Sequence, residues 1–258
     1  MENQKLKYEL IGDDMQMVEI ELAPKETVIA GIGAMNWMEE GISFDTSLSD
    51  GSEPEKGFFE RLFDAGKRVL VGESAFINHM TNMSDKNRKI GFGAPYPGKI
   101  IPIDLEAFSG KMYCLRDVFL CASLGTKISV KVNHKMGFGF FGTQGYVVQE
   151  LEGDGMAFLH TGGTVVKKVL GEETLRISGG CLVAYSQGIE CSVERIKGFE
   201  NMFFGGQGSF ITALSGTGVV YLQSLPFSKL ANRVISRMPK EPRTKERRTF
   251  SDDRFSSK

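Results

Sequence analysis

The sequence contains few of the residues on which most catalytic centres depend. Its 258 residues include three histidines, four cysteines and one tryptophan. His79, His134 and His160 form no H-x-H or H-x-x-E pair, so the usual spacing of transition-metal ligands is missing. There is no G-x-S-x-G elbow, and no glycine-rich stretch ends in the Gly-Lys-Ser/Thr of a phosphate-binding loop. These absences argue against an enzyme, and we predict no metal and no cofactor.

Cysteine spacing and hydropathy predict the compartment. No C-x-x-C pair occurs, and the four cysteines stand in apolar or alternating runs, which favours buried free thiols over ligands or disulfides: Cys114, Cys121, Cys181 and Cys191. The N-terminus lacks an apolar signal core, and no stretch approaches the roughly 20 apolar residues of a membrane span. We therefore expect a soluble, cytoplasmic protein.

Charge of one sign is concentrated at the C-terminus. The formal net charge is −1. Residues 229–258 hold ten Lys or Arg and four Asp or Glu, a balance of +6, so residues 1–228 carry −7. An acidic body argues against a phosphate-binding face spread over the fold, which makes nucleic-acid binding through the body unfavourable.

Glycine, in contrast, is abundant. The 31 glycines are about 12% of the chain, against roughly 7% in average proteins, which favours tight turns over long helices. Ile128–Val132 and Ile189–Val193 alternate with a period of two, which is typical of strands. Asp154-Gly155 and Thr217-Gly218 supply turns between such strands. The pattern predicts an all-β fold.

An internal repeat is the strongest signal in the sequence. A shift of 63 residues superposes Arg116–His160 on Gly179–Gln223 without a gap. Within this alignment, Phe140–His160 and Phe203–Gln223 share nine of 21 residues, and five of the nine are not glycine. Chance would give roughly one or two matches at average residue frequencies. The sequence therefore contains at least two copies of one β-module.

A third, more divergent copy precedes these two. Gly72–Asn82 takes the place of the repeated strand, and the next strand follows at Lys89–Gly98. Between the strand near Gly41–Leu48 and Gly72, apolar side chains at helical spacing predict a short helix near residues 55–70: Phe58, Phe59, Leu62 and Phe63. One module is too small to bury both its faces, so the three should pack together.

Predicted boundaries follow from these copies. We expect modules at residues 1–110, 111–173 and 174–227, in a pseudo-threefold arrangement. Residues 228–258 are expected to form a short helix or coil and a disordered basic tail, because the segment is polar and nearly free of aliphatic residues towards its end.

Several motifs resemble those of an uncharacterised bacterial family whose eukaryotic relative is the altered-inheritance-of-mitochondria protein 24. They occur in order over about residues 6–232: GAMNWMEEGI, GESAFI, APYPGKIIPIDL, FLCAS, GDGMAFLHTGGTV and GTGVVYLQSLPFS. That family has been classed with the trp RNA-binding attenuation protein. The resemblance therefore implies that each module is a β-sandwich of double-stranded β-helix type. The family, whose name links it to mitochondrial biogenesis, offers no established catalytic residues to carry over, and its mitochondrial member implies a role near the inner membrane without a defined reaction.

Repeated Phe-Gly loops are the main candidate for an interaction surface. Bulky Phe residues stand beside glycine in Met136–Gly142 and Phe199–Gly206, at the same place in two modules, and the Phe-rich helix takes that place in the first. One interpretation is core packing between modules. The other is a surface for self-association or membrane contact, with these candidate residues: Phe58, Phe59, Phe138, Phe140, Phe141, Phe203 and Phe204.

The basic tail supplies the alternative site. Its candidate polyanion contacts are Arg243, Lys245, Arg247 and Arg248. The sequence favours a non-enzymatic scaffold or interaction protein, a homo-oligomer that presents its repeated β-modules to a protein or membrane-surface partner. The alternative is a nucleic-acid or anionic-ligand binder that uses the tail and the module edges.

Overall fold

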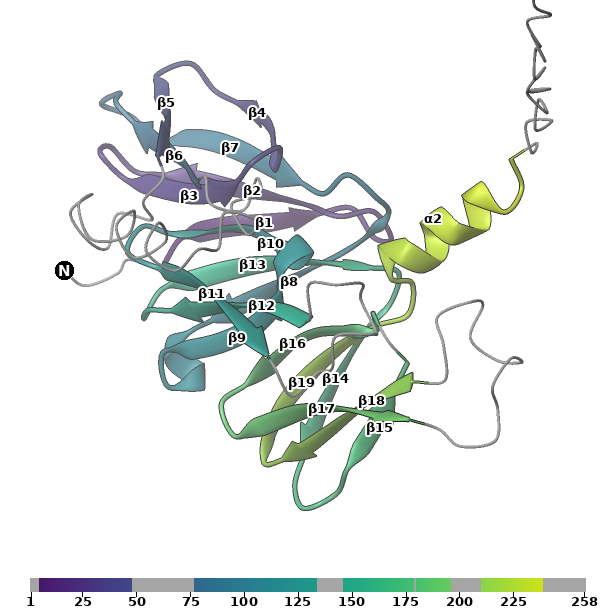
Figure 1. Ribbon diagram of the computed structural model, residues 1–258. Helices are drawn as coiled ribbons and strands as arrows, with labels where there is room; N and C mark the ends of the chain where they lie inside the picture. Colours follow the sequence, from purple (N-terminus) through teal and green to yellow (C-terminus); the bar gives the residue numbers. More distant parts are fainter. Residues whose placement is uncertain (1–4, 48–76, 134–145, 179, 196–209, 239–258) are drawn as a thin grey trace, which may run out of the picture.

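The described part of the chain forms four antiparallel β-sheets (Figure 1). The computed structural model describes residues 5–47, 77–133, 146–178, 180–195 and 210–238. In sheet order, the first sheet contains β1 (Lys7–Ile11), β2 (Met17–Leu22), β7 (Arg88–Gly93) and β4 (Met35–Met38). The second contains β5 (Ile42–Ser47), β6 (Ile77–Asn82), β3 (Thr27–Gly31), β10 (Phe119–Ser123), β13 (Met156–Gly162) and β8 (Gly98–Asp104).

The third and fourth sheets are formed by the C-terminal half. In sheet order, the third contains β11 (Lys127–Asn133), β12 (Tyr146–Glu152), β9 (Lys111–Leu115), β16 (Leu182–Ser186), β19 (Gly218–Gln223) and β14 (Val165–Leu170). The fourth contains β15 (Leu175–Ile177), β18 (Phe210–Gly216) and β17 (Ile189–Arg195). Short 3-10 helices η2 (Glu106–Phe108) and η3 (Arg116–Val118) flank β9, and helix α2 (Phe227–Ile235) follows the last strand. The all-β prediction is confirmed.

These sheets are stacked, and one hydrophobic core lies between each neighbouring pair. The first core joins the first and second sheets through residues such as Ile20, Phe92 and Phe158. A second core lies between the second and third sheets. The third core, which includes Leu182 and Leu214, lies between the third and fourth sheets. The two inner sheets therefore bury side chains on both faces.

Strand β13 shows how an inner sheet serves two cores. All seven of its residues are buried. Met156 and Phe158 pack in the first core, whereas Ala157 and Leu159 pack in the second. Because successive side chains of a strand point to opposite faces, a strand with both faces covered is a continuous apolar run. The run MAFL, at residues 156–159, is of this kind.

The same strand-pairing pattern occurs three times along the chain. The pairs β4–β7, β10–β13 and β16–β19 each carry a register shift at one place, between Met35 and Trp37, Phe119 and Cys121, and Leu182 and Ala184. The turn after β4, β10 and β16 places a glycine at φ +94°, +90° and +85°, a left-handed conformation that favours glycine: Gly41, Gly125 and Gly188. Threefold symmetry among the three sets of strands stays a prediction.

Hydrogen-bonded strand pairs also connect residues on the two sides of the module boundaries predicted at residues 111 and 174. Strand β8 pairs with β13 and β14 pairs with β19, so each belongs with strands that follow it in the chain. This grouping gives three sets of consecutive strands: β2 to β7, β8 to β13 and β14 to β19. The helix expected near residues 55–70 lies outside the described residues.

Candidate functional site

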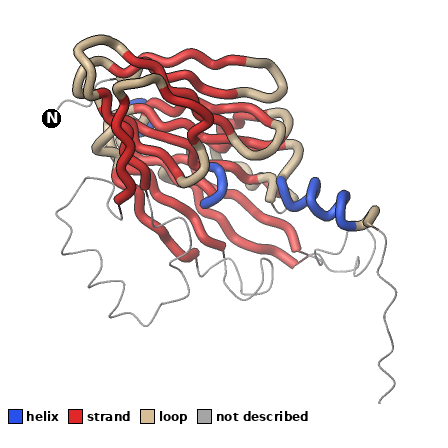
Figure 2. Tube along the Cα trace, turned by 90° about the horizontal axis from the view of Figure 1, so that it is seen from above, coloured by secondary structure: helices blue, strands red, loops and turns tan. Residues whose placement is uncertain are grey.

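Helix α2 is among the most exposed elements of regular structure in the described chain. It projects from one side of the stacked sheets (Figures 1 and 2). The helix starts after Pro226, whose carbonyl accepts hydrogen bonds from the backbone N–H groups of Lys229 and Leu230. None of the residues in the helix is buried. Neighbouring strands therefore cover no complete face of it.

The helix and the turn that follows it are amphipathic. Apolar residues recur at intervals of three and four, the spacing that places side chains on one face of a helix: Phe227, Leu230, Ala231, Val234, Ile235 and Met238. We call this set the apolar stripe. Val234, Ile235 and Met238 are 57%, 63% and 62% exposed. Lys229, Arg233 and Arg237 occupy the intervening positions, and residues 227–238 contain no acidic residue.

An aromatic cluster fixes the start of the helix to the second sheet. The Tyr96 ring lies 5.2 Å from the Phe227 ring and 4.5 Å from the His160 ring, centroid to centroid. His160 is 3% exposed, and its Nδ1 has no hydrogen-bond partner among the described residues. Burial lowers the pKa of His160 to about 4, although a hydrogen bond with the Tyr96 backbone opposes this shift. The imidazole is therefore neutral near pH 7, as expected for a packing role.

Gln223 occupies the position in β19 that His160 occupies in β13, and the structure explains its presence. Its Oε1 accepts a hydrogen bond from the Gly162 backbone N–H at 2.8 Å, and its Nε2 donates to the Gly180 carbonyl at 2.7 Å. The side chain therefore ties the end of β13 to the segment before β16. Both His160 and Gln223 have structural partners, and neither is placed to bind a metal.

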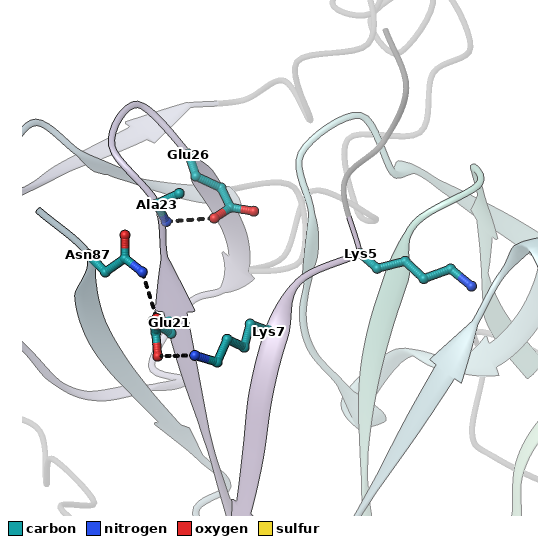
Figure 3. A pocket seen from close by; sticks show the side chains of 6 residues that line it. All are labelled: Lys5, Lys7, Glu21, Ala23, Glu26 and Asn87. Atoms are coloured by element: carbon teal, nitrogen blue, oxygen red, sulfur yellow. Dashed lines mark hydrogen bonds and ion pairs between the residues drawn. The ribbon is translucent and has the colours of Figure 1, made fainter.

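A shallow pocket of about 290 Å³ lies at the edge of the first sheet (Figure 3). Lys7 lies 2.9 Å from Glu21, which also accepts a hydrogen bond from Asn87 at 2.6 Å, and Glu26 accepts one from the Ala23 backbone N–H at 2.7 Å. The contacts with Lys7 and Asn87 lower the pKa of Glu21. Lys5 also lines the pocket, but its side chain points away from the other labelled residues (Figure 3), and its Nζ lies 2.9 Å from Asp104. With three of its four charged side chains in ion pairs, the pocket has little capacity for a charged ligand.

Buried charge also occurs on the third sheet, in a network with a structural role. The Glu150 carboxylate lies 2.9 Å from the Lys131 Nζ and 3.5 Å from the Lys111 Nζ. Burial alone would raise the pKa of Glu150, but Lys131 and a hydrogen bond from Tyr113 hold it below its usual value. The network joins β9, β11 and β12.

Three of the four cysteines are buried free thiols, as predicted: Cys114, Cys121 and Cys191. Burial raises the pKa of Cys191 to about 12, although a hydrogen bond with Tyr185 opposes the shift. Cys181 differs from the prediction, because it is only partly buried and lies 3.6 Å from the Lys229 Nζ. It stands in the irregular segment before β16.

The candidate residues selected from the sequence lie outside the described residues. This applies to the Phe-Gly loops, to the Phe-rich segment and to the basic tail: Phe58, Phe59, Phe138, Phe140, Phe141, Phe203, Phe204, Arg243, Lys245, Arg247 and Arg248. The apolar stripe was not among the predictions. Its three-and-four spacing is visible in the sequence.

In the part of the chain that the structure describes, no group of three or more His, Cys, Asp or Glu side chains is arranged to hold a metal ion. No described helix has the length and hydropathy needed to cross a bilayer.

Comparisons with known proteins agree with the fold. A crystal structure of protein SPYM3_0169 from Streptococcus pyogenes matches with a TM-score of 0.68 over 91% of this chain and 100% of that one, at 21% identity. This likeness shows a shared fold. No curated protein matches the chain at a significant level. A relation to the fold of the trp RNA-binding attenuation protein stays a prediction. The profile of the mitochondrial biogenesis AIM24 family matches residues 8–225, and the chain therefore belongs to that family.

Proposed function

We propose that the protein is a non-enzymatic scaffold that docks on an anionic membrane surface through helix α2, with the stacked sheets as its rigid platform. The apolar stripe beside three cations, on a helix without an acidic residue, is the observation that carries this proposal. A short helix of this kind lies in the membrane interface, where its apolar face enters the lipid and its Lys and Arg side chains meet the headgroups.

The attachment of the helix supports the same role. A nine-residue helix is too short to be stable alone in water, so it depends on its junction with the body. The contact between Phe227 and Tyr96 supplies this junction at the first turn, while Val234, Ile235 and Met238 stay exposed further along. The free end of the stripe is therefore available to a partner surface.

The binding free energy expected from the three cations favours an anionic surface over a neutral one. Each Lys or Arg close to an anionic membrane contributes about 1 kcal/mol. Lys229, Arg233 and Arg237 would together contribute about 3 kcal/mol, or roughly a hundredfold in affinity at low salt. A purely apolar protein groove would gain little from these three cations. The cytoplasmic location stays a prediction and is compatible with docking on the inner leaflet.

Vesicle flotation tests the proposal. The full chain is mixed with vesicles of phosphatidylcholine alone or with phosphatidylglycerol added. We expect binding to the anionic vesicles only, and at least a tenfold loss in the double variant Val234→Ser/Ile235→Ser. The matched control is Val166→Ser/Val169→Ser, which changes two exposed apolar side chains on β14 and should bind like the unaltered chain.

Each contrary result has a definite meaning. Equal binding by the stripe variant and the unaltered chain would refute docking through α2. If the unaltered chain ignores anionic vesicles but binds single-stranded RNA in a salt-dependent way, the alternative of polyanion binding through the tail replaces the proposal.

A further inference from the structure

The inner sheets are each joined from two sets of strands, and the joint has the same form in both. In the second sheet, β3 of the first set pairs with β10 of the second; in the third sheet, β9 of the second set pairs with β16 of the third. Each joint is antiparallel and three residue pairs long. The pairs are Ala30–Cys121, Ile29–Ala122 and Val28–Ser123 in one, and Cys114–Ala184, Tyr113–Tyr185 and Met112–Ser186 in the other.

Each outer sheet of the stack contains one strand that corresponds to a joint strand but lacks the joint partner among the described residues. Strand β4 carries the same register shift against β7 that β10 and β16 carry against their partners. Strand β15 pairs with β18 as β9 pairs with β12, with Leu175, Arg176 and Ile177 at the places of Met112, Tyr113 and Cys114. Among the described residues, β4 and β15 are both edge strands with one side unpaired.

We propose that β15 of one copy of this chain pairs with β4 of the next, so that copies join head to tail as the sets of strands join within one copy. This proposal goes beyond membrane docking and does not involve α2. The two internal joints define its register. Ile177 lies opposite Trp37 of the next copy, Arg176 opposite Met38, and Leu175 opposite Glu39.

The side chains at this edge suit an interface. Trp37, the single tryptophan of the chain, is 36% exposed, and its indole lies against Gly91, where a side chain would collide with it. Met38 beside it is 38% exposed. In the proposed joint Trp37 meets Ile177, which already belongs to the third core. An exposed, rigid aromatic side chain at an open sheet edge is a common anchor in interfaces.

An internal joint shows that this register brings side chains into contact. The Tyr113 and Tyr185 rings, which lie opposite each other in the β9–β16 joint, are stacked with centroids 5.2 Å apart. Arg176 and Met38 occupy the corresponding positions in the proposed joint. A long Arg side chain can pack its stem along Met38 and keep its charge in water.

Charge on the outer faces makes the joint weak. The outer face of the first sheet carries the ion pairs Lys89–Glu19 and Lys7–Glu21, and the fourth sheet carries Arg176–Glu194 at 2.7 Å. Polar outer faces of this kind are typical of capping elements in repeat proteins. We therefore expect reversible, concentration-dependent association through the edges rather than a permanent apolar interface. Because the contact is heterologous, it produces rings or open chains of copies.

Cross-linking between copies that each carry one exposed cysteine, with Cys114, Cys121 and Cys191 buried, tests the proposal. In a Cys181→Ser background, one copy carries Arg176→Cys and the other Met38→Cys, and a short thiol cross-linker is added to each alone and to their mixture. The mixture should give a covalent dimer, and neither copy alone should. The matched control mixes Arg176→Cys with Glu9→Cys, since Glu9 is exposed on β1, at the opposite edge of the first sheet. This control should not cross-link above background.

A second readout uses the single tryptophan. Emission from Trp37 in the unaltered chain should shift to shorter wavelength as concentration rises, together with the sedimentation coefficient. Cross-linking of either variant with itself as efficiently as in the mixture would overturn the head-to-tail arrangement. A chain that stays monomeric at high concentration, with no dimer in the mixture, would overturn the joint itself. The variant Val234→Ser/Ile235→Ser should give the same cross-linking and the same Trp37 emission as the unaltered chain. These two measurements are therefore independent of membrane docking.

Discussion

Strand β13 and helix α2 differ sharply in how far their side chains are buried. Every residue of β13 is buried, and its side chains serve two cores at once. No residue of α2 is buried, although its apolar residues have the spacing of a helix that packs on a surface. On this contrast folding stability resides in the stacked sheets, whereas apolar surface at the periphery stays uncovered in the described residues. The predictions below test this division.

The largest expected effect is in the inner sheets. Phe158 is fully buried in the first core, and its ring lies 4.9 Å from that of Tyr8. Phe158→Ala should lower the free energy of unfolding by about 3–5 kcal/mol, because it removes apolar contacts and leaves a cavity. Val234→Ala in the exposed stripe should change it by less than about 0.5 kcal/mol. Urea denaturation measures both, and equal effects would refute the division.

A smaller effect is expected where β13 meets the segment before β16. Gln223→Ala leaves the Gly162 N–H and the Gly180 carbonyl without their side-chain partner, which should cost about 1–3 kcal/mol of unfolding free energy. The control is Gln187→Ala, at an exposed position. If both variants are equally stable, Gln223 does not tie these segments together.

The smallest effect concerns pH at the base of the helix. Burial lowers the pKa of His160 from 6.5 to about 4, so the unfolded chain takes up a proton before the folded chain does. The stability contributed by neutral His160 is present in full above about pH 6.5 and is lost as the pH falls towards 4. Between pH 7.5 and 5 we expect a loss of about 1–2 kcal/mol from this group. His160→Gln should remove that part of the pH dependence, and an unchanged slope would contradict the assignment.

Local strand patterns were readable from the sequence, whereas strand partners were not. Alternation predicted the strands at Ile128–Val132 and Ile189–Val193, which correspond to β11 and β17. The pairing of β8 with β13 joins residues about 60 apart, so it depends on tertiary packing that no local pattern encodes. For the same reason the joints between sets of strands, and the open edges that they imply, became visible only in the structure.

Local hydropathy correctly predicted the burial of three cysteines and wrongly predicted that of the fourth. Runs of apolar residues around Cys114, Cys121 and Cys191 correctly indicated burial. Cys181 stands beside an apolar run but before the strand starts, so the hydropathy of its neighbours wrongly predicted full burial. The stripe on α2 was readable in principle, because its spacing is regular. That it stays uncovered depends on the position of the helix relative to the sheets, which the sequence does not specify.

Hydrogen exchange by mass spectrometry, with and without anionic vesicles, tests the central claim most directly. In solution, amides of β13 and β16 should exchange slowest and those of residues 227–238 should be among the fastest, because the helix is anchored only at its first turn. On phosphatidylglycerol-containing vesicles, protection should rise in residues 227–238 and stay unchanged in the sheets. Protection that rises in the strands instead, or nowhere, would contradict the proposal that a rigid stack carries a membrane-docking helix.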